Sequence, residues 1–182
     1  FLGTSQCGRR GDTIQQFDAC VGEVMKTLAE QGLAENTLVL VSSDNGGCGV
    51  YQEEEKKYGY KENGPLRGYK VTPYEGGVRE PFIVRWPDQV KAGTTCDQVV
   101  GLVDCLATVA AITGQALPAD AAPDSFSFLP VLRDPSKAVR DHIITQSGVA
   151  SHPACAREIR VGKWKLIPND KQEKPELYDL AT

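Results

Sequence analysis

Two segments of the sequence carry side chains that could hold a cation and an anion. The run Thr37 to Val41 is apolar and β-branched, which predicts a short buried strand, and Asp44 and Asn45 follow directly after it. In open α/β sheets, ligands bind at this end of a strand, and carboxylate and amide oxygens suit Ca²⁺ or Mg²⁺. Farther along the chain, Lys70 offers an ammonium group that can donate to a tetrahedral oxyanion.

Each of these signals also has a plain explanation. Asp-Asn-Gly is favoured in tight turns, where Asn and Gly tolerate positive φ. A single lysine such as Lys70 is usually a solvated surface residue. The residue types alone therefore leave both a cation and anion site and an ordinary turn open.

The surrounding sequence resembles the sulfatase family. Sulfatases carry a strand that ends in Ser/Thr-Asp-Asn-Gly, as Ser43 to Gly46 does here, followed by the pattern Leu-Arg-Gly-x-Lys-x-x-x-Tyr-Glu-Gly-Gly-x-Arg-x-Pro. Residues 66–81 match every fixed position of that pattern. The resemblance implies that Asp44 and Asn45 bind Ca²⁺, with Mg²⁺ as an alternative. It also implies that Lys70 contacts the sulfate group as a catalytic and substrate-binding residue.

The resemblance further implies that part of the active site lies upstream of this chain. The sulfatase nucleophile is a formylglycine made from the first residue of Cys/Ser-x-Pro-x-Arg, and no such run occurs in these 182 residues. We therefore interpret the chain as an internal or C-terminal portion of a sulfatase that hydrolyses aryl or carbohydrate sulfates, inactive alone. His152 lies in a loop and is either a surface residue or a substrate contact; we include it as a substrate-binding candidate.

Three flanking side chains are expected to shape the site without reacting. Glu75 and Arg79 bracket Gly76-Gly77 and are predicted to form a buried ion pair that fixes the turn. Arg67 is expected to act in the same way.

Two rival functions stay open. One is a phosphate or phosphonate ester hydrolase of the same alkaline-phosphatase-like architecture, because a metal carboxylate and a lysine suit any tetrahedral oxyanion. The other is a non-catalytic module that binds sulfated glycans. A nucleophile motif in the coding sequence upstream of Phe1 would favour an enzyme, and its absence a binding module.

Charge and composition argue against two classes of partner, nucleic acids and membranes. The net charge is −4 and no basic stripe occurs, which argues against a nucleic-acid-binding protein. No apolar run approaches the roughly 18 residues that cross a bilayer.

Cys20 and Cys105 fall in helical patterns and are expected to be buried thiols. The family resemblance implies an exported protein with a sulfated small molecule or glycan as its partner; oligomeric state is left open.

The pattern of elements predicts an α/β fold. A helix is expected from about Asp12 to Gly32, with Ile14, Phe17, Val21, Val24 and Leu28 on one face, and strands at 37–41 and 81–86. Residues 52–62 are predicted as a polar loop, 102–113 as a helix, 115–123 as a surface connection, and 142–146, 156–161 and 164–167 as short strands. The helix-then-strand order favours a largely parallel sheet. The resemblance implies an alkaline-phosphatase-like layered sheet with helices on its faces over 1–123, and a small C-terminal antiparallel β subdomain over 124–182.

Overall fold

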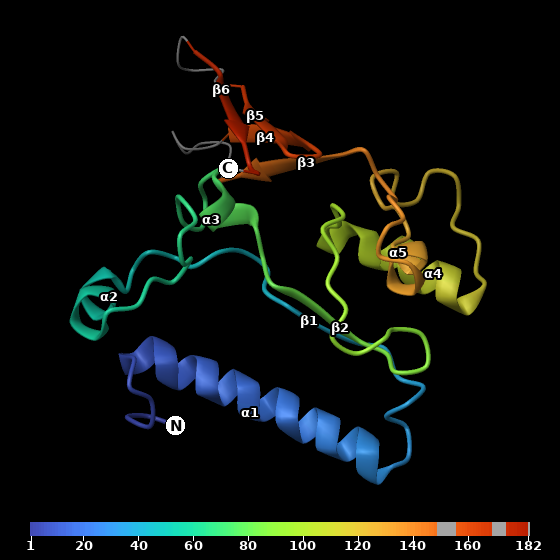
Figure 1. The fold of residues 1–182 in the computed structure, drawn as a ribbon, viewed down its shortest axis with the longest axis horizontal. Coiled ribbons are helices and arrows are strands. Elements are labelled where there is room, and N and C mark those ends of the chain that lie inside the picture. Colours follow the sequence, from blue (N-terminus) through green and yellow to red (C-terminus); the bar gives the residue numbers. More distant parts are fainter. Residues whose placement is uncertain (149–155, 169–173, 182) are drawn as a thin grey trace. The chain divides into compact units, whose positions relative to one another are not determined.

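The structure is a computed structural model that describes residues 1–148, 156–168 and 174–181. By packing, the chain forms two compact units (Figure 1). The first comprises Phe1–Asp88 with Ser147–Cys155, and the second Gln89–Gln146 with Ala156–Thr182. The predicted boundary at residue 123 concerns the domains of a complete enzyme and stays a prediction.

The first unit begins with the long helix that the periodicity predicts. α1 spans Gly8–Glu30, and Gly32 follows it with a φ of 67°, as expected for a glycine at a helix end. The predicted apolar face is only partly covered: Ile14, Phe17 and Val24 are each about half exposed, at 53%, 50% and 54%. The pattern therefore identified the helix, but the described residues do not bury that face.

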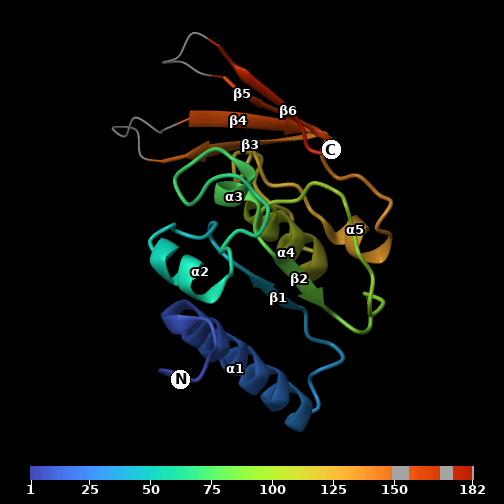
Figure 2. The ribbon, with the colours of Figure 1, turned by 60° about the vertical axis from the view of Figure 1, so that its left-hand side comes forward.

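The two predicted strands of this unit pair with each other. β1 spans Val39–Ser42 and β2 spans Phe82–Arg85, and Figure 2 shows them side by side. They run antiparallel, with Val39 opposite Arg85 and Ser42 opposite Phe82. The expected largely parallel sheet is therefore wrong for the described chain, because residues 43–81 bring the chain back in the opposite direction. The four residues of β1 are half-buried, not buried as predicted, since β1 has a single partner strand here.

Two short helices lie between these strands. The predicted polar loop at 52–62 is instead α2, Gln52–Tyr58, followed by Gly59 in the left-handed conformation. Glutamates fill its first turn and lysines its last, which is the charge order that favours a helix dipole, so the charge run builds a helix. α3 spans Glu75–Val78 and contains the buried pair Gly76-Gly77.

The second unit contains a helical part and a sheet. The predicted helix at 102–113 is confirmed as a 3₁₀ turn, η1, Leu102–Asp104, followed by α4, Cys105–Thr113, with Gly114 in the left-handed conformation. The connection at 115–123 has no helix or strand, as expected. α5 spans Leu129–Arg133, and Ala110, Phe128 and Val131 are buried here.

The sheet of the second unit has four strands in sequence order. β3 is His142–Ser147, β4 is Ala156–Val161, β5 is Trp164–Ile167 and β6 is Glu176–Asp179. The three predicted strands are confirmed, and β4 with β5 forms an antiparallel pair across the predicted turn at Gly162. β6 was missed; it pairs antiparallel with β5, so that Lys165 lies opposite Tyr178.

Two further expectations can be compared with the structure. In the described part of the chain, no helix combines the length and the apolar character needed to span a membrane. Cys105 is partly buried, but Cys20 is exposed, so its predicted burial is wrong. Both are free thiols.

Candidate functional site

Backbone hydrogen bonds join the loop that carries Asp44 and Asn45 to the segment that carries Lys70. The Lys70 amide donates to the Gly47 carbonyl at 2.8 Å, and the Gly46 amide donates to the Gly77 carbonyl at 3.2 Å. Both loops belong to the first unit. The predicted site residues are therefore close in the backbone even though the sequence separates them.

Glycines make this close approach possible. A Cβ atom built on Gly46 would lie 1.8 Å from the Gly76 carbonyl oxygen of the other loop, whereas one on Gly77 would lie 2.4 Å from the Thr72 carbonyl oxygen of its own loop. Neither position can accept a side chain without moving backbone atoms. The Asn-Gly and Gly-Gly pairs therefore mark the places where the two loops contact each other.

The candidate side chains themselves are available to a ligand. Asp44 and Lys70 are exposed, and their side chains make no hydrogen bond or ion pair with any described residue. Asn45 is half-buried, and its Nδ2 donates to the Gly46 carbonyl at 3.0 Å, which leaves Oδ1 as a possible metal ligand. A carboxylate and an amide oxygen on one loop fit a hard cation, although two ligands do not fill the shell of Ca²⁺.

The carboxyl group of Glu80 is affected by the charge of Asp44. Burial raises the pKa of Glu80 above its ordinary value, and the negative charge of Asp44 raises that pKa further. Among the described residues, however, no group of three or more His, Cys, Asp or Glu is arranged to hold a metal ion.

The expected ion pair of the glycine turn is only partly as predicted. Arg79 Nη1 lies 3.9 Å from Glu75 Oε2 within α3 and the residue after it, but the Arg79 side chain is 57% exposed, so the pair is not buried. Arg67 instead stacks on Tyr74, with its guanidinium carbon 3.7 Å from the ring centroid, and donates to the Tyr74 hydroxyl at 2.9 Å.

Sequence reasoning missed two residues that contact the site loops. The Asn63 side chain accepts from the Gly47 amide and donates to the Gly68 carbonyl, both at 2.8 Å. The neighbouring Glu62 accepts from the Gly49 amide at 3.0 Å. Both residues lie in the stretch predicted as a polar loop or just after it, and Asn63-Gly64-Pro65 has the composition of an ordinary turn.

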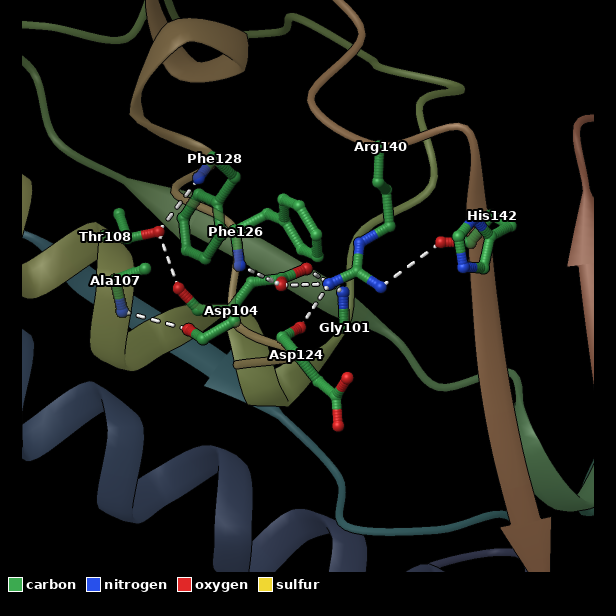
Figure 3. Close-up of polar contacts among 10 residues, drawn as sticks. Gly101, Asp104, Ala107, Thr108, Asp124, Phe126, Phe128, Arg140 and His142 are labelled. Carbon is green, nitrogen blue, oxygen red and sulfur yellow. Dashed lines mark hydrogen bonds and ion pairs between the residues drawn. The ribbon is translucent and has the colours of Figure 1, made fainter. Parts of the chain in front are cut away.

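A second polar cluster, in the other unit, is structural in character (Figure 3). Asp104 is fully buried, accepts hydrogen bonds from the amides of Gly101 and Phe126, and forms an ion pair with Arg140. Arg140 also donates to the carbonyls of Asp124 and His142. The Asp104 carboxylate and the Arg140 guanidinium are turned onto protein partners, which suits a role in holding Asp124 and Phe126 beside Gly101 and the start of β3.

The remaining candidate, His152, lies outside the described residues. The other histidine, His142, is exposed at the start of β3, with Nδ1 2.6 Å from an Asp141 carboxylate oxygen.

Two family models match the chain. A model described as Sulfatase matches residues 3–115, and one described as N-sulphoglucosamine sulphohydrolase, C-terminal, matches residues 69–182. The chain therefore belongs to the sulfatase family, and the resemblance inferred from its motifs is confirmed.

The chain is also similar to individual curated sulfatases. The chain is 37% identical to an N-acetylgalactosamine-6-O-sulfatase of Bacteroides thetaiotaomicron over 100% of its own length and 38% of that protein's. It is 38% identical to human N-acetylgalactosamine-6-sulfatase over 72% of its own length and 24% of the human protein. The chain thus spans well under half the length of the curated relatives it matches.

Solved structures agree on the fold. A Bacteroides thetaiotaomicron structure described under the metabolism of multiple glycosaminoglycans superposes with a TM-score of 0.86 at 34% identity, covering 100% of this chain and 40% of that one. A phosphonate monoester hydrolase from Silicibacter pomeroyi superposes at 0.66 with 21% identity over 89% of this chain and 32% of its own, which shows the fold alone. The predicted alkaline-phosphatase-like α/β class is confirmed.

Proposed function

We propose that this chain supplies the Asp44-Asn45 and Lys70 side of the active site of a carbohydrate sulfatase. The observation that carries the proposal is the joining of the two loops by the Lys70 amide and the Gly47 carbonyl, at 2.8 Å, with the side chains of Asp44 and Lys70 exposed. The 37% identity to an N-acetylgalactosamine-6-O-sulfatase over the whole chain supports a sulfated amino sugar as the substrate class.

Lys70 would bind the anion. Its ammonium group has no protein partner in the described chain, so it can donate to a sulfate oxygen without breaking an existing contact. A sulfate ester carries diffuse negative charge, and cleavage places more charge on its oxygens. A fixed cation beside those oxygens therefore lowers the barrier as well as binding the substrate.

Asp44 and Asn45 would hold the divalent cation. Their oxygens suit Ca²⁺, with Mg²⁺ as the alternative, and a single negative charge from Asp44 leaves the ion with excess positive charge. When bound, such an ion polarises the oxygens of the ester. The remaining metal ligands, and the formylglycine nucleophile that sulfatases use, would come from polypeptide outside this chain.

The test uses the longest gene product that contains this chain. We expect it to hydrolyse 6-O-sulfated N-acetylgalactosamine, and we expect the 182-residue chain alone to be inactive. The variant Lys70→Met should lower kcat/KM by at least about a hundredfold, as for loss of one charge-stabilising donor. Lys91→Met is the control, because Lys91 is an exposed lysine of the other unit.

The rival functions give different results in the same assay. Faster cleavage of a phosphonate monoester than of the sulfate ester would favour the phosphonate hydrolase, whose fold this chain shares. Binding of sulfated glycan without turnover would favour the non-catalytic module. Turnover by the 182-residue chain alone would contradict the split active site.

Export from the cytoplasm, which the family resemblance implies, is part of this proposal. A tagged gene product should be found in the periplasmic, secreted or lysosomal fraction, and retention in the cytoplasm would contradict it.

A further inference from the structure

We propose that Asn63 is a positioning residue that sets the separation between the Asp44-Asn45 pair and Lys70. This inference rests on the proposed function, because it assigns a role in the same site. The assignment comes from hydrogen bonds of the Asn63 side chain and not from any sequence motif.

Asn63 connects the two loops with both ends of one carboxamide. Its Oδ1 accepts from the Gly47 amide at 2.8 Å, and its Nδ2 donates to the Gly68 carbonyl at 2.8 Å. Gly47 lies two residues after Asn45, and Gly68 lies two residues before Lys70. The Asn63 side chain therefore bridges the same two loops that the hydrogen bond from the Lys70 amide to the Gly47 carbonyl joins directly.

This arrangement requires both a donor and an acceptor at residue 63. An aspartate would keep the bond to the Gly47 amide but would place a carboxylate oxygen against the Gly68 carbonyl, where no proton is available to share. An alanine would leave both backbone groups without the side-chain partner. The carboxamide is thus matched in polarity to the two loops.

Glu62, the residue before Asn63, is anchored by its own contacts. The Glu62 side chain is 0% exposed, accepts from the Gly49 amide at 3.0 Å through Oε2, and has Oε1 3.7 Å from Arg10 Nε of α1. A Cβ atom on Gly47 would lie 2.3 Å from Glu62 Oε2 and 3.0 Å from Asn63 Oδ1, so the segment packs directly on that glycine. We call Glu62 and Asn63 the loop clamp.

The loop clamp would act through position and not through contact with substrate. A cation held by Asp44 and an anion held by Lys70 cooperate only at a fixed spacing, and outer residues that orient metal ligands typically contribute about 10- to 100-fold in affinity or activity. Asn63 lies outside every helix and strand, so its loss should loosen the loops while leaving α1 and the β1–β2 pair in place.

The experiment compares Asn63→Asp with Asn36→Asp in the full gene product. Asn36 is an exposed residue of the same unit, so the control introduces the same charge without touching the site loops. Amide hydrogen exchange is followed at Gly47, Gly49 and Lys70, and at amides of α1 as an internal reference. In parallel, kcat/KM and the Ca²⁺ concentration for half-maximal activity are measured.

We expect Asn63→Asp, which loses the bond to the Gly68 carbonyl, to speed exchange at the Lys70 amide by at least about tenfold, with α1 unchanged. We also expect it to lower kcat/KM and raise the half-maximal Ca²⁺ concentration by about 10- to 100-fold. Asn36→Asp should match the wild type in each measurement. Unchanged exchange at Lys70, or an equal rise in exchange throughout α1, would overturn the proposal, as would an unchanged Ca²⁺ requirement in an active variant. If the wild type cleaves no sulfate ester, the proposed function fails, and the exchange result still decides whether Asn63 holds the loops.

Discussion

The loops around Asp44 and the cluster around Asp104 use the same kinds of residues in opposite ways. Asp104 is buried and accepts from two backbone amides as well as from Arg140. The side chains of Asp44 and Lys70 are exposed, and the loops that carry them are joined by backbone groups, including the Lys70 amide, and by the Asn63 side chain. Charged side chains that hold a fold therefore satisfy one another, whereas those proposed to bind a ligand are fixed through the main chain and left available.

The largest expected effect is loss of the carboxylate in the buried cluster. Asp104→Ala would leave Arg140, whose side chain is 5% exposed, without its ion-pair partner and would free two backbone amides. We expect the free energy of unfolding to fall by about 3–5 kcal/mol, measured by urea denaturation. The matched change Asp44→Ala should stay within about 0.5 kcal/mol. Equal losses of unfolding free energy in Asp104→Ala and Asp44→Ala would contradict the difference between the two regions.

The second prediction uses two lysines of the β4–β5 hairpin, one in its turn and one inside β5. Lys165 on β5 is 2% exposed and pairs with the buried Glu158, whereas Lys163 in the turn is 53% exposed and pairs with Asp179 at 2.7 Å. Lys165→Met should lower the free energy of unfolding by about 3 kcal/mol, because the Glu158 charge stays buried. Lys163→Met should lower it by at most about 1 kcal/mol. Thermal unfolding of the two variants would show whether burial sets the difference.

The third prediction concerns two glycines of the first unit. Gly46→Ala would place a methyl group against the Gly76 carbonyl oxygen and force the site loops apart, at a cost of about 1–3 kcal/mol. Gly22→Ala, inside α1 with nothing within 4 Å of the new atom, should instead stabilise by about 0.5–1 kcal/mol. Denaturation midpoints that move in the same direction would contradict the close loop contact.

The smallest effect is a pH dependence at Asp12, a second satisfied carboxylate. Hydrogen bonds from the amides of Gly3 and Ser5, at 2.7 and 2.8 Å, hold the pKa of Asp12 below its ordinary value of 3.8. Because the folded pKa is depressed, the stability that these bonds provide is present above pH 3.8 and is lost as pH falls through the folded value. The stability difference between wild type and Asp12→Asn should therefore shrink with acid. A constant difference from neutral pH to pH 2 would contradict it.

The sequence predicted those features that local pattern determines. The spacing from Ile14 to Leu28 identified α1, and Gly114 and Gly162 marked a helix end and a hairpin turn. The family motif placed Asp44, Asn45 and Lys70 on loops that the backbone joins. In each case the information lies within a short stretch of chain or within the motif itself.

Other features depend on partners that no local pattern encodes. The direction of β2 relative to β1 follows from the long connection between them, and the half-exposed face of α1 follows from what packs on it. The charge run at 52–62 has the composition of a loop, and only the order of its charges, glutamates before lysines, indicates the helix α2. Asn63 was missed because its role appears only where it meets Gly47 and Gly68.

The most direct test of the proposed site is a crystal structure of the full gene product with Ca²⁺ and inorganic sulfate. The account predicts a cation within about 2.3–2.6 Å of oxygens from Asp44 and Asn45. It also predicts a sulfate oxygen within about 3 Å of Lys70 Nζ. A cation bound elsewhere, or a Lys70 ammonium directed away from the anion, would contradict it.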